Sequence, residues 1–280
     1  MTQTQTKAVQ AYQLPGNPVI PVPILGNLLY DERGEEAVAI LNAAFRGRKG
    51  IKYTTKHKPR QPLTRSNTAR NMFFHDLLRE QFTSDNLRVQ SPADMVRYWD
   101  ILLEQDTTYA DSNTIAIFPN PGPNENLRIE VLQALGRTAT TVPLLVSGLK
   151  PVKVDTAEGW TLKRTDFTTV KEAPYLQKDG RVRYDSATQD LVAAKDNEDG
   201  VQIYVPNDQS GLRRAGRDGG NFLNFGVGGL LDSNAVGRVP LVQDPKGCAE
   251  NLDALVESIH AERERQIAEV KSRHKNTNMK

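Results

Sequence analysis

The stretch Asn71 to Phe82, NMFFHDLLREQF, places large apolar side chains at intervals of three and four residues. These side chains are Phe73, Phe74, Leu77, Leu78 and Phe82. Residues at this spacing share one face of an α-helix, and an apolar helix face is usually buried. The stretch therefore predicts a helix that packs firmly on the core. Its aromatic rings are expected to be core residues first and stacking surfaces for bases only second.

Two further helices are predicted, one on each side of this one. Before it, apolar residues recur at helical spacing from Gly34 to Phe45, and two glutamates suit the first turn of that helix. After it, Ser91, Pro92 and Asp94 supply a cap, a proline at the first helical position and an acid three residues beyond the cap. We therefore expect residues 31–110 to be rich in helix.

The most strongly basic part of the chain, Arg46 to Arg70, lies between the first two of these helices. Its cations are Arg46, Arg48, Lys49, Lys52, Lys56, Lys58, Arg60, Arg65 and Arg70. No acidic side chain offsets them between Glu36 and Asp76. Glycines and prolines exclude a long helix, so we expect a loop or an irregular hairpin. Cations at this density favour contact with an anion, most often a phosphate backbone.

An aromatic residue stands inside this basic segment. Tyr53 lies between Lys52 and Lys56, where its ring can stack on a base while its neighbours hold phosphates. Tyr53 can equally be a half-buried residue of a short strand, and the cations can serve solubility or meet an acidic subunit. Contact with nucleic acid is the interpretation that the pattern favours.

The C-terminal half alternates strand and turn signals. Strands are expected over Asn113–Phe118, Thr141–Leu149, Gly159–Val170 and Val201–Val205, with a short helix over Glu125–Leu135 that ends at Gly136. A hairpin turn is expected at Lys178–Arg181. The fold class predicted from these signals is α+β, with a helix-rich N-terminal part, a mixed or antiparallel sheet in the C-terminal part and a long C-terminal helix.

Four parts of the chain are distinguished by their composition. They are an extended N-terminal arm over 1–30, a helical region over 31–110 with the basic loop 46–70, an α/β region over 111–247 with a glycine-rich loop over 210–238, and a C-terminal helix over 248–280. In the arm, prolines interrupt apolar residues. Such a segment buries its surface most easily against another copy of the chain, which indicates an oligomer or a multi-subunit complex.

The glycine-rich loop carries Arg213, Arg214 and Arg217 close to flexible backbone. This combination can cradle phosphates, grip a nucleic-acid strand or a neighbouring subunit, or form purely structural turns. It has no Walker pattern, and Leu231 stands where a dinucleotide motif needs its third glycine. A nucleotide cofactor is therefore not expected.

In character, the stretches 46–70 and 210–238 together resemble the repeat-type backbone subunits that coat guide RNA in CRISPR effector complexes. The resemblance rests on a glycine-rich loop beside a basic insertion in a mixed α/β chain, and it includes no diagnostic motif. It implies an RNA-coating subunit as a fold-level analogy.

Composition limits the remaining possibilities. The chain has 280 residues, 38% of them hydrophobic, which suffices for a real core, and its formal net charge is +2. The single cysteine, Cys248, excludes an internal disulfide framework and a multi-cysteine metal site. No export signal and no apolar run of membrane length are present. We expect a soluble cytoplasmic protein without a metal or a cofactor.

Catalytic motifs are not evident. The histidines are His57, His75, His260 and His274, and none stands in a pattern that pairs a base with an orienting group. We therefore predict a non-enzymatic nucleic-acid-binding protein, with RNA favoured over DNA, that is a subunit of a larger assembly. The predicted contacts are Arg46, Arg48, Lys49, Lys52, Tyr53, Lys56, Lys58, Arg60, Arg65, Arg213, Arg214 and Arg217. The alternatives are a self-assembling coat protein and an enzyme that acts on a phosphorylated substrate at the glycine-rich loop.

Overall fold

Helices and strands are defined for several ranges of the chain in the computed structural model. It describes residues 32–46, 55–56, 63–83, 87–100, 109–154, 159–218, 222–231 and 239–243. The predicted N-terminal arm and the predicted C-terminal helix lie outside these residues. Within them, no helix has the length and apolar character needed to cross a membrane.

The helices that apolar spacing predicts are present. They are α1 (Glu32–Ala44), α2 (Thr68–Gln81), α3 (Pro92–Arg97) and α5 (Glu125–Ala134). Asn67 caps α2 by accepting the Arg70 backbone N–H at 2.9 Å. Ser91 and Asp94 form the expected capping box of α3. At the end of α5, Gly136 has a φ of 72°, as its predicted role of C-terminal cap requires.

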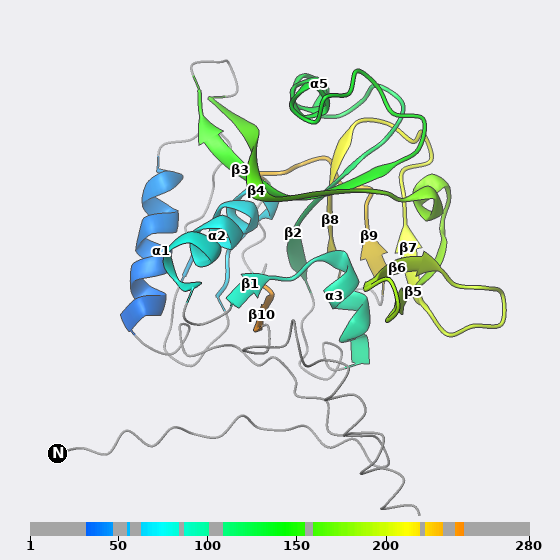
Figure 1. Ribbon diagram of the computed structural model, residues 1–280, viewed down its shortest axis with the longest axis horizontal. Helices are drawn as coiled ribbons and strands as arrows, with labels where there is room; N and C mark the ends of the chain where they lie inside the picture. Colours follow the sequence, from blue (N-terminus) through cyan, green and yellow to red (C-terminus); the bar gives the residue numbers. More distant parts are fainter. Residues whose placement is uncertain are drawn as a thin grey trace, which may run out of the picture. The chain divides into compact units, whose positions relative to one another are not determined.

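An eight-stranded sheet with the order β4-β3-β2-β8-β9-β7-β5-β6 forms the body of the protein (Figure 1). Its strands are β2 (Ala110–Ile117), β3 (Leu144–Lys153), β4 (Trp160–Glu172), β5 (Gly180–Asp185), β6 (Asp190–Ala193), β7 (Val201–Tyr204), β8 (Leu212–Asp218) and β9 (Phe222–Asn224). Neighbouring strands are antiparallel except β7 and β9, which are parallel. A smaller sheet joins β1 (Leu87–Val89) to β10 (Leu241–Gln243). The fold is therefore mixed α/β with a mostly antiparallel sheet.

The alternation of side chains along the strands produces two cores. Ile115 and Val146 pack in one core with residues of α1, α2 and α5, whereas Ala116 and Leu145 pack in the other with Met95 of α3. In Figure 1, α1 lies beside α2, and α2 packs on β2 and β3. The two faces of the central strands are thus covered by different helices.

Two parts of the sheet differ from expectation. The hairpin predicted at Lys178–Arg181 is wrong, because β5 begins at Gly180 and pairs with β6 and β7. The Asp179 carboxylate instead accepts the Val205 backbone N–H at 2.8 Å. The stretch expected to form a glycine-rich loop contains two strands, β8 and β9. The glycines of this stretch favoured the prediction of a loop over that of strands.

Candidate functional site

A cavity of about 420 Å³ lies on the sheet face that α3 covers. It is bounded by α2, by the segment from Arg88 to Arg97, by the neighbouring strands β4, β3 and β2, and by β5, β6 and the turn between them. Polar and charged side chains form most of its lining, beside the rings of Phe167 and Tyr184. A cavity of this size, with convergent polar groups, is the default candidate for a binding site.

A row of hydroxyl groups crosses three strands and forms the floor of the cavity. Thr114 of β2 is paired with Ser147 of β3, and Ser147 is paired with Thr169 of β4. The hydroxyls of Ser147 and Thr169 are 2.6 Å apart. Strand register therefore aligns three hydroxyls, of which that of Thr114 donates to the Asn113 side-chain oxygen at 3.0 Å and remains an acceptor.

His75 of α2 lies buried at one wall of the cavity. Its Nδ1 accepts a hydrogen bond of 2.8 Å from Asn113, and the ring also hydrogen-bonds the Val89 backbone. Burial, together with the charges of Arg79 and Arg88, lowers the pKa of His75 to about 4. His75 is thus neutral at pH 7 with both ring nitrogens engaged, so it orients Asn113 and is unsuited to accept a proton.

An ion pair strengthens the wall that precedes α3. Arg88 donates two hydrogen bonds to the carboxylate of Asp94, of 2.5 and 2.8 Å. Burial alone would raise the pKa of Asp94, but the hydrogen bonds from Arg88 and Ser91 outweigh it and leave the pKa below its ordinary value. The charges of Arg88 and Asp94 therefore neutralise each other, and their hydrogen bonds hold this wall of the cavity in place.

A large bulge in β4 forms the opposite rim. Between the paired positions Ser147/Thr169 and Leu149/Arg164, the residues 165–168 of β4 stand opposite the single residue Gly148. The hydroxyls of Thr165 and Thr168 both donate to the Gly148 carbonyl, at 2.7 and 2.8 Å. The bulge presents Asp166 and Phe167 at the cavity, and 37% of Phe167 is exposed.

Two arginines lie against aromatic rings of this cavity. The guanidinium carbon of Arg79 is 5.2 Å from the centre of the Phe167 ring, and that of Arg97 is 5.2 Å from the Tyr184 ring. Arg97 is exposed and, within the described ranges, has no carboxylate partner. A third cation, Lys171, pairs with Asp190 at 2.8 Å. The cavity thus combines cations with exposed aromatic surface.

These groups are suited to bind an anionic, partly aromatic ligand. Hydroxyls and guanidinium groups hydrogen-bond phosphate oxygens, and the Phe167 ring offers a stacking face. Among the described residues, no group of three His, Cys, Asp or Glu side chains is placed to hold a metal ion.

Most of the contacts predicted in the basic segment fall outside the residues that the structure describes. These are Arg48, Lys49, Lys52, Tyr53, Lys58 and Arg60. Arg46 and Lys56 are described, and both are exposed. The backbone of Lys56 pairs with that of Thr64 in an antiparallel bridge, and Arg65 follows with a φ of 63°. This pairing is compatible with the irregular hairpin expected there.

Arg70, the last cation of the basic segment, belongs to the interior. It is 1% exposed, and one of its Nη atoms donates to the Thr55 hydroxyl at 3.0 Å and to the Arg65 carbonyl at 3.1 Å. Its guanidinium also lies over the Phe45 ring. Burial lowers its pKa to about 10. Arg70 therefore joins Thr55 and Arg65 of the segment to α2.

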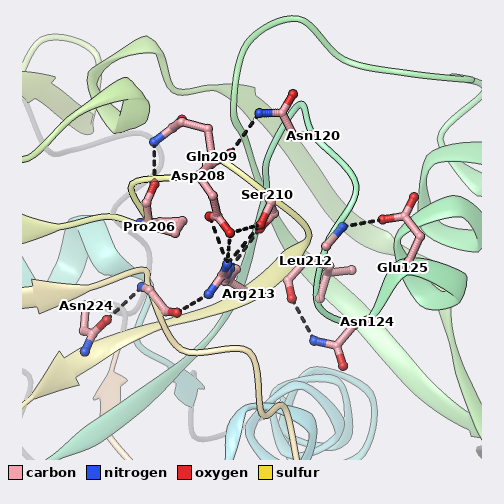
Figure 2. A network of polar contacts seen from close by, with 12 residues as sticks. Asn120, Asn124, Glu125, Pro206, Asp208, Gln209, Ser210, Leu212, Arg213 and Asn224 are labelled. Carbon is pink, nitrogen blue, oxygen red and sulfur yellow. Dashed lines mark hydrogen bonds and ion pairs between the residues drawn. The ribbon is translucent and has the colours of Figure 1, made fainter.

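Arg213 is the centre of a polar network within the protein (Figure 2). It donates to the Ser210 carbonyl at 2.8 Å, to the Gly226 carbonyl at 2.5 Å and to the Asp208 carboxylate at 3.2 Å. The hydroxyl of Ser210 also donates to Asp208, at 2.5 Å. The side chain thus clamps the turn before β8 to the segment after β9.

The other two predicted arginines of β8 also have intramolecular partners. Arg214 lies 3.4 Å from a carboxylate oxygen of the buried Asp111 and over the Tyr109 ring. Arg217 is 6% exposed and lies over the Trp99 ring. None of the three arginines lines the cavity. Their contact with nucleic acid stays a prediction.

Close packing explains at least one glycine of the glycine-rich stretch. Gly211 has a φ of 78°, and an added Cβ would lie 2.5 Å from the Pro123 backbone. Its lack of a side chain thus lets two segments of the same chain approach one another. This packing is sufficient to explain why residue 211 is a glycine, and a phosphate-binding role is not needed to explain it.

Sequence reasoning missed the cavity residues Arg79, Arg97 and Phe167. Arg79 was part of a helix recognised by its apolar face, and Phe167 was part of a predicted strand. The sequence signal for the bulge was the polar run Thr165–Asp166 within that strand. Comparison with protein-family models, curated proteins and solved structures gave no match to this chain.

Proposed function

We propose that this protein binds nucleic acid without catalysis, as a cytoplasmic subunit of a larger ribonucleoprotein assembly. The observation that carries the proposal is the rim of the cavity, where Phe167 is exposed beside Arg79 and Arg97 lies over Tyr184. Aromatic faces stack on bases of any sequence, while neighbouring arginines hold phosphates.

Single strands fit this rim better than a duplex. A base must leave its stack to place a face on Phe167, which costs least in single-stranded nucleic acid. The hydroxyl floor of Thr114, Ser147 and Thr169 adds donors and acceptors for a ribose, including its 2′-hydroxyl. This chemistry favours RNA over DNA.

The basic segment extends the proposed surface. Arg46 and Lys56 are exposed, and Arg70 hydrogen-bonds Thr55 and Arg65, which stand on either side of Lys56, Lys58 and Arg60 in the sequence. Cations on an anchored segment lose less conformational entropy on binding than cations on a free tail. The predicted N-terminal arm and C-terminal helix are assigned to contacts with other subunits, as part of the same proposal.

Binding of fluorescein-labelled single-stranded RNA to the full chain, followed by fluorescence anisotropy, tests the proposal. We expect Phe167→Ala to weaken binding at least about 5-fold, because stacking contributes roughly 1–3 kcal/mol per base. Arg97→Ala should weaken it by a similar factor. The matched controls are Tyr204→Ala and Arg181→Ala, which remove an exposed aromatic and an exposed cation outside the cavity.

Purification from the native host without nuclease gives an independent test. The proposal predicts that RNA and other polypeptides accompany the protein, and that nuclease treatment disperses the assembly. Particles that keep their size on a gel-filtration column after nuclease treatment would instead support a self-assembling coat. If the cavity variants and their controls bind RNA with equal affinity, the cavity does not take part in RNA binding.

A further inference from the structure

The carboxylates around the cavity differ in their partners. Asp94 is held by Arg88, and Asp190 by Lys171. Asp166, in contrast, is exposed and has neither an ion pair nor a hydrogen bond among the described residues, although it lines the cavity. A carboxylate without such a partner, in a cavity that already contains cations, is available to a ligand.

The bulge of β4 determines which ligand groups this carboxylate can meet. Asp166 immediately precedes Phe167, and both line the same cavity. The bulge is fixed by the hydrogen bonds of Thr165 and Thr168 to Gly148. A planar ring stacked on Phe167 would therefore have its edge near an acceptor that is held on the same rigid turn.

Among the RNA bases, guanine has the edge that matches a carboxylate. Its N1–H and N2–H donors lie side by side, and an ionised carboxylate accepts through two oxygens. Adenine and cytosine each place a ring acceptor beside their amino group, and uracil places two carbonyls around its N3–H. These acceptors would face the negative charge of Asp166 unfavourably.

We infer that the cavity takes an unstacked guanine of single-stranded RNA, with its face on Phe167 and its N1–H and N2–H donors on the Asp166 carboxylate. The inference rests on the proposed nucleic-acid function and names the base that the same site selects. The cations of the cavity, Arg97 among them, then lie beside the sugar-phosphate backbone of that nucleotide.

Anisotropy titrations of the full chain with three RNA oligomers test the inference. The oligomers are identical except for a central guanine, inosine or adenine. A bidentate contact is worth roughly 1–3 kcal/mol, so guanine should bind about tenfold more tightly than adenine. Inosine keeps N1–H but lacks the N2 amine, and it should fall between them.

The variant Asp166→Asn supplies a specific signature. An amide offers one acceptor and one donor, which complements N6–H and N1 of adenine. The variant should therefore lose the preference for guanine, and its affinity for the adenine oligomer should equal or exceed that for guanine. Asp196→Asn, at an exposed aspartate outside the cavity, should retain the preference of the unmodified protein.

Three results would overturn the inference, and they are distinguishable. Equal affinity for all three oligomers, with tight binding retained, would refute the selection of guanine and leave the nucleic-acid function intact. Absence of binding to every oligomer at low salt would refute both. A guanine preference that survives Asp166→Asn would exclude Asp166 as its source.

Discussion

Gly148 lies directly against the backbone of Phe167. An added Cβ at Gly148 would be 2.2 Å from the Phe167 carbonyl oxygen and 2.6 Å from its carbonyl carbon. Gly148 also has a φ of 69°, in the left-handed region. The bulge that presents Phe167 at the cavity therefore depends on a residue without a side chain.

Gly148→Ala should reduce the free energy of unfolding by at least about 3 kcal/mol, measured by urea denaturation. The left-handed backbone accounts for roughly 1–2 kcal/mol of this loss, and the collision with backbone atoms for the rest. Gly136→Ala is the matched control, because Gly136 has a φ of 72° and nothing within 4 Å of its Cβ position. Equal losses of unfolding free energy in the two variants would show that the bulge accommodates the added methyl group without a further energetic penalty.

The buried His75 should make the protein sensitive to mild acid. Its pKa is lowered from 6.5 to about 4, so between these values the unfolded chain binds a proton that the folded chain does not. This contribution is fully present above pH 6.5 and is lost as the pH falls. Between pH 7 and pH 5, we expect a loss of about 2 kcal/mol in the free energy of unfolding.

The variant His75→Gln isolates that effect, because glutamine keeps hydrogen-bonding groups but does not titrate. Its stability should fall less than that of the unmodified protein over the same pH range, in parallel urea titrations. The lowered pKa of Asp94 acts at more acidic pH and therefore does not obscure the comparison. Parallel pH profiles for the two proteins would refute a neutral, buried His75.

Arg70 should matter for stability more than its place in a basic segment implies. Arg70→Met removes the guanidinium donor from the Thr55 hydroxyl and from the Arg65 carbonyl, which then keeps only the Thr55 hydroxyl at 3.5 Å, and it should cost about 2–4 kcal/mol of unfolding free energy. Arg181→Met, on the exposed surface of β5, should change stability by less than about 0.5 kcal/mol. A similar loss of unfolding free energy in both variants would show that the buried contacts of Arg70 do not stabilise the fold.

The local parts of the fold could be predicted from the sequence because their signals are local. The apolar face of α2, the capping box at Ser91 and the cap at Gly136 each depend on residues within a few positions of one another. Helix type and approximate bounds follow from such signals. The same is true of β2 and β3, which each contain a short apolar run.

The candidate site could not be predicted because it depends on register between distant strands. Thr114, Ser147 and Thr169 form a row only once β2, β3 and β4 pair as they do. The presence of an arginine in the sequence also does not show whether its side chain is exposed, as in Arg97, or buried, as in Arg70. Burial and partners of an arginine are properties of the tertiary structure.

The salt dependence of RNA binding tests the proposed function most directly. Anisotropy titrations of single-stranded RNA with the full chain, at a series of salt concentrations, give the slope of log affinity against log salt. If about five phosphates are engaged, the slope should be roughly −3.5, and it should become shallower in Arg97→Ala. A flat salt response, or no binding at low salt, would contradict the proposal that this protein binds nucleic acid.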